Sequence, residues 1–419
     1  VYFQQDDGFQ EKHFPAIAND SISEDVSISI EDFNNDGRKD IFMVSSGGEF
    51  SGENSALNDR LYFNIGNKFE KQPIPKYFEN GSVVKTSDFN KDGFPDVFVG
   101  GGAVSNDFGK IPNSYILLND NGKFRIEENT ALQNIGMVTD AAWIDFDEDG
   151  WEDLVVVGEW MSPAFFRNNK GSLENVTSKV LSGNLTGLWQ SIIPFDINSD
   201  GKMDLLLGNW GLNTKFDASE EFPLKMFYND FDKNGSTETI VAYAKNGKYY
   251  PAAGLDELVS QLSYLRKKFP SYTKFAGKEL KQIFDQEKLV DAKLFEVNTL
   301  ASGYLLNTNG KFTFKEFISG LQVAPITEFL KADFNNDSEE EILVGGNYFG
   351  TTPYHGRFDG FPGSIITSEG KILPGHELGL NFTQKAVTSL DLVKIGEEKY
   401  LMVTYNNRKP SFYKLLSHE

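Results

Sequence analysis

Residues 145–154 read DFDEDGWEDL and place carboxylates at positions one, three, five and nine of a tight loop. Ca²⁺ binds six to eight oxygens at about 2.3–2.6 Å, and alternate acidic side chains around a glycine-containing turn supply them from one short segment. The expected ligands are the side chains of Asp145, Asp147, Asp149 and Asp153 and the carbonyl oxygen of Trp151. The stretch therefore predicts a calcium-binding loop.

The flanks of this loop distinguish it from an EF-hand, which needs a bidentate acid at position twelve and a helix on each side. Position twelve here is Val156. The flanking runs MVTDAAWID and DLVVVGEW are short, apolar and β-branched, which is typical of strands. We expect the loop to join two strands.

The same pattern recurs along the chain. The first aspartates of six copies are Asp32, Asp88, Asp145, Asp196, Asp230 and Asp333, with spacings of 56, 57, 51, 34 and 103 residues. A seventh copy lies 58 residues after the sixth and keeps only Asp391, so we expect it not to bind metal. Recurrence at a period of about 55 residues is typical of a repeat architecture.

Positions one, three, five and nine of each loop are expected to bind calcium through side chains, and position seven through its carbonyl oxygen. Besides the residues of the third loop, the predicted ligands are Asp32, Asn34, Asp36, Arg38, Asp40, Asp88, Asn90, Asp92, Phe94, Asp96, Asp196, Asn198, Asp200, Lys202, Asp204, Asp230, Asp232, Asn234, Ser236, Glu238, Asp333, Asn335, Asp337, Glu339 and Glu341. The first four loops are expected to bind well. The fifth, with Asn234 and Glu238, and the sixth, with Ser338 and Glu341, are expected to bind more weakly, which gives four to six ions in total.

A hairpin of the form strand, Asn/Gly turn, strand follows most loops, as in SYILLNDNGKFRIEE from Ser114. Each unit then has four antiparallel strands, and seven such units predict an all-β, seven-bladed β-propeller that forms one domain over residues 1–419. Residues 1–14 read as strands three and four of a unit. We expect them to pair with strands near 400–416 and complete the last blade, so that no sheet edge remains open.

One segment departs from the strand pattern. Leu258, Leu262, Leu265 and Phe269 have helical spacing, and Pro270 ends the run. We expect a small helical insertion over residues 254–295, between strands two and three of blade five. The 34-residue spacing before it predicts an abbreviated fourth blade.

Composition narrows the function. The net charge of −21 disfavours nucleic acid as a partner, and six Ca²⁺ ions would bring this charge to −9. No apolar run of 18 residues is present to span a membrane, and zero cysteines exclude disulfides and thiol chemistry. Because calcium sites of this kind fill most readily outside the cytosol, we expect an exported bacterial protein.

The loop followed by an apolar strand and Gly resembles the FG-GAP or VCBS repeat of the integrin α-subunit propeller and of cartilage acidic protein. Three stretches, IGMVTDAAWIDFDEDGWEDLVVVGEW, LLLGNWGLNTKF and DELVSQLSYLRKKFPSYTKFA, resemble the C-terminal half of long Bacteroidota surface proteins with FG-GAP repeats and an ASPIC/UnbV module. That resemblance implies a calcium-binding propeller at the outer-membrane surface, held there through the rest of a longer protein, and it implies no reaction.

In a four-stranded meander, all the acidic loops would share one face, and the long Gly- and aromatic-rich loops would share the other. Side chains on the second face are the candidate ligand contacts: Trp160, Trp210, Tyr348, Phe349, Tyr354, His355, Arg357 and Phe358. The alternative is that they only pack across the blade tops. We expect a non-catalytic module that binds a protein partner. A glycan-binding module, or a carbohydrate-active enzyme with an acid pair such as Glu159 and Asp359, is the alternative.

Overall fold

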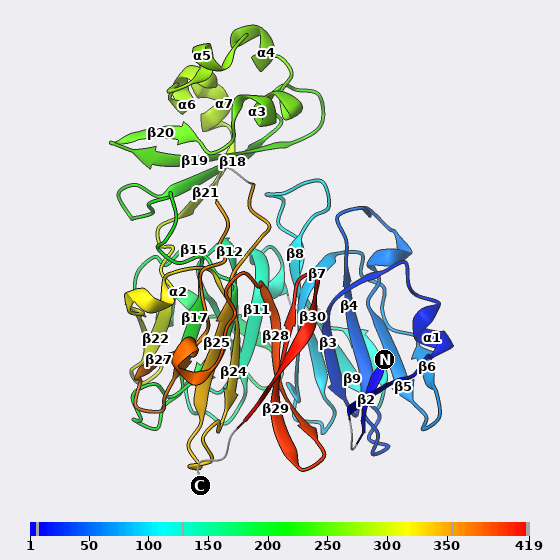
Figure 1. The fold of residues 1–419 in the computed structure, drawn as a ribbon. Coiled ribbons are helices and arrows are strands. Elements are labelled where there is room, and N and C mark those ends of the chain that lie inside the picture. Colours follow the sequence, from blue (N-terminus) through cyan, green and yellow to red (C-terminus); the bar gives the residue numbers. More distant parts are fainter. Residues whose placement is uncertain (6–7, 128–129, 353–355, 416–419) are drawn as a thin grey trace.

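The computed structural model describes residues 1–5, 8–127, 130–352 and 356–415. The sheets stand side by side, and a smaller unit that contains most of the helices projects from one end of them (Figure 1). The repeated unit predicted from the sequence is present as a four-stranded antiparallel sheet. The first three are β3 (Glu24–Glu31), β4 (Asp40–Ser46), β5 (Arg60–Asn64) and β6 (Phe69–Gln72); β7 (Asn80–Ser87), β8 (Asp96–Ala103), β9 (Tyr115–Asp120) and β10 (Lys123–Ile126); and β11 (Met137–Ile144), β12 (Asp153–Met161), β13 (Ala164–Asn168) and β14 (Leu173–Asn175), with β15 (Gly187–Leu188) beside β12.

Three more sheets continue the series. They are β16 (Ser191–Phe195), β17 (Asp204–Gly208), β22 (Gly303–Asn307) and β23 (Phe312–Glu316); β24 (Ile326–Ala332), β25 (Glu341–Gly346), β26 (Ser364–Ile366) and β27 (Ile372–Pro374); and the three-stranded β28 (Val387–Ile395), β29 (Glu398–Tyr405) and β30 (Arg408–Lys414). The first strand of each sheet packs beside the first strand of the next, in the order β3, β7, β11, β16, β24 and β28. This all-β, β-propeller-like arrangement confirms the predicted fold class.

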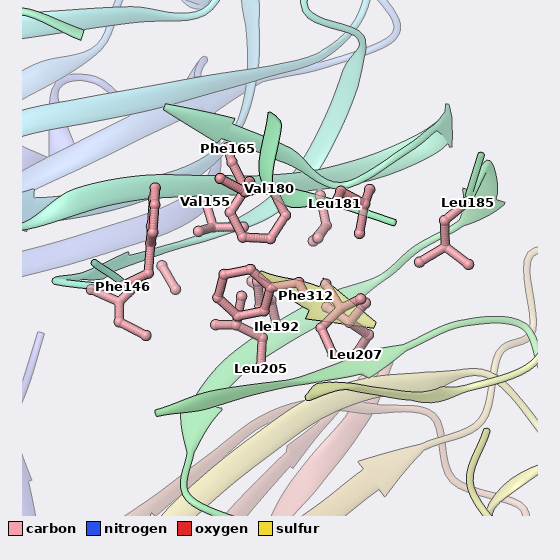
Figure 2. Packing of buried hydrophobic residues seen from close by; sticks show 14 of the residues in the cluster. Phe146, Val155, Phe165, Val180, Leu181, Leu185, Ile192, Leu205, Leu207 and Phe312 are labelled. Atoms are coloured by element: carbon pink, nitrogen blue, oxygen red, sulfur yellow. The ribbon is translucent and has the colours of Figure 1, made fainter. Parts of the chain in front are cut away.

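Apolar side chains fill the spaces between neighbouring sheets. Figure 2 shows the layer between the third and fourth sheets, where Phe146 and Phe165 meet Phe312. The residue at position two of the first three acidic loops, Phe33, Phe89 or Phe146, is at most 1% exposed. These three acidic loops therefore place their second residue in the core between sheets.

The fifth predicted unit differs in position from the expectation. β17 pairs with β22, so the fourth sheet takes its outer strands from residues 303–316 and is not abbreviated. Residues 209–302 form an insertion between β17 and β22. Within it, the fifth acidic loop joins β18 (Leu224–Asn229) to β19 (Glu238–Lys245), in a separate sheet with β20 (Lys248–Pro251) and β21 (Lys293–Val297). The fourth and fifth acidic loops are only 34 residues apart because the fifth loop lies in this insertion and not in the next sheet of the series. The outer strands of the fourth sheet, β22 and β23, follow only after the insertion.

Five short helices lie between β20 and β21, rather than between strands two and three of blade five. They are α3 (Leu255–Gln261), α4 (Leu265–Lys268), α5 (Tyr272–Phe275), α6 (Leu280–Ile283) and α7 (Gln286–Val290). The apolar positions predicted from helical spacing, among them Leu258, Leu262 and Leu265, are buried against Phe231 and Ile240 of the inserted sheet. Helical character is confirmed, but the run breaks after Gln261.

The N-terminal segment also differs from the expectation. β1 (Tyr2–Gln5) and β2 (Gly8–Glu11) pair with each other in a two-stranded sheet, and no pairing joins them to β30 within the described residues. After them come α1 (Pro15–Ala18) and then the first sheet. Other short helices among the described residues are α2 (Thr177–Val180) and the 3-10 turns Ser55–Leu57, Thr130–Leu132, Ser319–Leu321 and Gly375–Leu378. Among the described residues, no helix is long and apolar enough to cross a membrane.

Candidate metal loops and ligand face

All six acidic loops adopt one backbone conformation. The fourth residue has a positive φ of 55° to 61°, and the sixth has 84° to 91° where it is glycine. Ser338 takes this place in the sixth loop with φ 74°, a left-handed conformation that a β-carbon disfavours. The sixth loop therefore reaches the common shape at a cost in backbone strain.

Hydrogen bonds within each loop orient the carboxylates in the same way. In the third loop, Asp145 accepts the N–H groups of Asp149 and Gly150 at 3.0 and 2.8 Å, and Asp149 accepts the N–H of Trp151 at 2.9 Å. The equivalent bonds recur in the other five loops. The turn of the backbone thus faces the acidic side chains toward one another.

The ninth residue is the buried carboxylate of each loop. Asp153 accepts the N–H of Phe146 in its own loop at 3.3 Å and that of Asn168 at the end of β13 at 2.7 Å. Glu238 and Glu341, one carbon longer, keep the first of these bonds at 2.9 Å. The longer side chain is therefore accommodated at position nine in the fifth and sixth loops.

Burial and the nearby carboxylates both raise the pKa of these ninth residues. Burial, together with repulsion by Asp92 and Asp88, raises the pKa of Asp96 to about 7. Burial, together with repulsion by Asp147 and Asp149, likewise raises the pKa of Asp153 to about 7. A cation between these carboxylates would remove the repulsion and favour the charged form.

Unpaired carboxylate oxygens indicate that the loops fit a cation. Asp147 Oδ1, Asp96 Oδ2 and Asp232 Oδ1 are buried without a hydrogen-bond donor. In the third loop, oxygens of Asp145, Asp147 and Asp149 lie within 4.8 Å of one another. A buried carboxylate oxygen with no partner is costly, and a metal ion is one group that satisfies it. Arg167 Nε contacts only the other oxygen, Oδ2, of Asp147 at 2.8 Å.

The fifth loop forms the second such cluster within the described chain, with Asp230, Asp232 and Glu238. The sequence ranked this loop among the weaker sites because Asn234 and Glu238 depart from the pattern. Its geometry nevertheless resembles that of the third loop, and binding strength itself stays a prediction.

A set of asparagines missed by the sequence reasoning connects the loops to neighbouring sheets. Asn168 donates through Nδ2 to the carbonyl oxygen of Phe89, in the preceding sheet's loop, at 2.9 Å and to that of Glu152 at 3.0 Å. Asn119 and Asn307 make equivalent bonds to the preceding loops. Their signal in the sequence is an Asn near the end of the third strand in the first four sheets, just before the turn. Asn119, Asn168 and Asn307 make the first three acidic loops part of the contact between two sheets.

The loops of the main sheets share one end of the molecule, as predicted. Asn35 Nδ2 of the first loop lies 3.3 Å from the Gly93 carbonyl of the second, and Lys91 of the second donates to Gly150 of the third. The fifth loop is the exception. Its residue Thr237 donates to Asp107, in the loop after β8 at the opposite end, and Tyr228 Oη donates to the same carboxylate at 2.8 Å. The inserted sheet therefore docks over the second sheet.

Most of the predicted ligand-face aromatics that the structure describes gather on that opposite end. The ring of Trp210 lies 6.0 Å from Tyr348 and 5.5 Å from Phe358, and the guanidinium of Arg357 lies 3.8 Å above Phe349. Trp160 and Phe358 are buried in the core, so they pack between elements. Tyr354 and His355 lie outside the described residues. In this group, Tyr348 is 38% exposed and the side chain of Arg357 is 56% exposed.

A groove of about 1060 Å³ opens at the same end, between the tops of the first two sheets and the insertion. Its lining is mostly amides, hydroxyls and glycines, including Asn80, Ser82, Asn106, Gln190 and Thr239, with Phe108 and Tyr348 as its aromatic members. The one carboxylate in its wall, Asp107, is engaged by Tyr228 and Thr237. Neutral polar groups thus dominate this groove.

Comparison with known proteins supports the repeat. Residues 32–99, 88–156 and 145–207 each match the FG-GAP-like repeat. No curated protein matches the chain.

Solved structures with similar arrangements include the V. cholerae biofilm matrix protein Bap1, at 10% identity and a TM-score of 0.36, covering 91% of this chain and 74% of that one. BBS1N in complex with ARL6DN has 10% identity and a TM-score of 0.34, covering 97% and 93% of the two chains. Saccharomyces cerevisiae Sqt1 has 11% identity and a TM-score of 0.32, covering 100% and 98%. From the family match and its own sheets, this chain carries FG-GAP-like repeats within a β-propeller-like all-β fold.

Proposed function

We propose that this chain is a non-catalytic, calcium-stabilised binding or assembly module of the cell exterior that recognises a protein partner. The observation that supports the proposal most strongly is that the two ends of the sheets carry different kinds of loops. One end holds five short acidic loops that tie neighbouring sheets together. The other end carries the insertion, the groove and the aromatic cluster, in which Tyr348 and Arg357 are exposed.

Calcium is the ion that the donor set favours. The side chains directed into the loops are carboxylates and amides, which are hard oxygen donors, and the loops contain no histidine. Extracellular calcium is abundant enough to fill sites of moderate affinity, so this chemistry supports a location outside the cytosol.

A protein partner fits the residue types at the opposite end. Arg357 stacked on Phe349, and Tyr348 beside Trp210, are combinations of Arg and aromatic side chains that dominate binding energy at protein interfaces. The insertion adds further exposed side chains, among them Tyr272 and Val290.

A glycan is the second candidate, and the groove favours it. Hydroxyl and amide groups with few free charges suit a neutral, hydroxyl-rich ligand, and Phe108 and Tyr348 would offer faces for sugar rings. The two carboxylates considered for a carbohydrate-active enzyme each contact another side chain. Gln190 donates to Glu159 at 2.9 Å, and Asp359 pairs with Arg357 at 3.6 Å.

The experiment is a binding screen of the calcium-loaded chain against arrayed surface proteins and glycans. Tyr348→Ala and Arg357→Ala should weaken binding of a true partner. Ile65→Ala, an exposed apolar residue in the turn after β5 at the loop end, is the matched control. If only Ile65→Ala weakens binding of a partner, the binding face is the end with the acidic loops and the proposal is wrong on this point. If the chain turns over a glycan substrate, the proposal that it is non-catalytic is wrong.

A further inference from the structure

The first and last sheets of the series flank a hairpin that is only half a sheet. On β1, Phe3 faces the first sheet, where it packs with Phe14 and Phe69 near Ile41 and Met43. On β2, Phe9 faces the other way and lies 5.8 Å from Phe412 of β30. The hairpin therefore occupies the outer part of a space between two sheets. Its strand β1 has one edge without a partner strand among the described residues.

Exposed apolar side chains line the inner part of the same space. Ile28 and Ile30 of β3 are 52 and 57% exposed and pair with Met43 and Ile41, so they lie on the face of the first sheet that Phe3 contacts. The residues that match Ile28 by distance to the acidic loop in three other sheets, Val84, Ala141 and Phe329, are buried against the preceding sheet. Ile28 is apolar like these residues, but no preceding four-stranded sheet among the described residues covers it.

The last sheet, on the opposite side of this space, has a threonine whose equivalents in two other sheets bond to the following sheet. The bulged residues Thr139 and Thr327 donate their hydroxyls to backbone carbonyls of the next sheet, at Trp189 and Val387, both at 2.9 Å. Thr388 is the bulged residue at this position in the last sheet, and its hydroxyl contacts Thr404 of the same sheet at 3.0 Å. Ser82, the bulged residue of the second sheet, also bonds within its own sheet, to the Gly100 carbonyl at 3.0 Å. In two of the other sheets this position therefore bonds to the following sheet, and at Thr388 that bond is not made.

The inserted sheet cannot supply what is missing. One of its faces is covered by helices α3 to α7, and the other packs on Met137, Trp160 and Leu188. Both faces are already engaged, so another pair of strands is required.

We propose that the space bounded by β1, β3 and β28 is a docking site for a β-hairpin of the repeat's own kind, strand, acidic loop, strand, from a polypeptide segment outside residues 1–419. The incoming strands would add to the free edge of β1 and complete a four-stranded sheet. Their apolar side chains would cover Ile28 and Ile30, and a backbone carbonyl would accept from Thr388. Such an exposed apolar strand face beside an open edge is otherwise an aggregation hazard.

The test uses a synthetic peptide of residues 80–103, which spans β7, the second acidic loop and β8, added to the calcium-loaded chain. We expect saturable binding that Ile28→Asp weakens about tenfold or more. Because Ile28 is exposed, this change should leave the melting temperature of the chain nearly unaltered. The matched control, Val290→Asp on the insertion at 73% exposure, should bind the peptide normally. A peptide with Val84→Asp and Val99→Asp should bind poorly.

Hydrogen exchange provides a second readout. Binding should slow exchange of backbone amides in β1 and β3 and leave those in β19 unchanged. Absence of both binding and added protection would overturn the proposal. So would a chain that dimerises by itself and becomes monomeric with Ile28→Asp, because the occupant would then be a second copy.

Discussion

At the scale of single residues, Asp149 and Asp337 allow the metal contribution to be separated from local hydrogen bonding. Each is the fifth residue of its loop, and each accepts one N–H from the seventh residue, at 2.9 and 2.8 Å. Replacing either with Ala removes the same backbone bond. We predict that Asp149→Ala reduces the calcium-dependent rise in melting temperature more than Asp337→Ala does, because the third loop has carboxylates at four predicted side-chain ligand positions and the sixth loop at three. Thermal unfolding with and without calcium measures this, and equal losses would contradict it.

Asn168 provides a second test at this scale. Its side chain bonds the second acidic loop to the third sheet through Phe89 and Glu152. Asn168→Ala leaves two buried carbonyls with fewer donors and should lower the free energy of unfolding by about 1–3 kcal/mol. Asn169→Ala, at the exposed neighbouring position, is the control. Denaturant unfolding in saturating calcium compares them, and a loss of equal size at both positions would argue against the bond between sheets.

Glu328 predicts a pH dependence. Burial, together with repulsion by Asp140 and Asp391 and against the opposing charge of Lys85, raises its pKa from 4.5 to about 8. The folded chain therefore holds a proton that the unfolded chain releases, so stability falls as pH rises from about 4.5 to 8. Glu328→Gln should remove this part of the decline, and its melting temperature relative to the parent should increase between pH 5 and 8. The exposed Glu397→Gln should change nothing, and a pH-independent offset for Glu328→Gln would refute the assignment.

At the scale of elements, the insertion is held over the second sheet by Asp107, which accepts from Tyr228 and Thr237. Asp107→Ala should loosen this docking and leave the main sheets intact, because the inserted sheet has its own core. We expect faster proteolysis and hydrogen exchange in residues 262–278, with little change in the melting of the remaining chain. Asp120→Ala, at an exposed strand end, serves as the control. Unchanged exchange in the insertion would mean that its apolar contacts alone secure it.

At the scale of the whole molecule, chelation should destabilise the fold. Ions bound only to the native state stabilise it by mass action, by about 2.7 kcal/mol per site at a hundredfold excess over Kd. Excess EDTA should therefore lower the melting temperature, and EDTA saturated with calcium beforehand should not. An unchanged melting temperature after complete calcium removal would mean that the packing between sheets suffices without metal.

The sequence determined the repeating unit and the shape of the acidic loops, because both depend on neighbours within about ten residues. Alternating acids, the glycine at position six and the apolar strands on each side are local features, and all six loops take the same conformation. Even Glu238, a departure from the pattern, occupies the expected ninth position.

The tertiary structure decided which strands meet. The sequence placed the fifth unit in the ring, whereas β17 pairs with β22 about a hundred residues later, and the insertion docks through Asp107 instead. Strands β1 and β2 likewise lie between two sheets, and among the described residues they pair with each other and not with β30. Strand partners and docking contacts depend on long-range packing, which local spacing does not encode, because any strand of this repeat carries an apolar face that fits several neighbours.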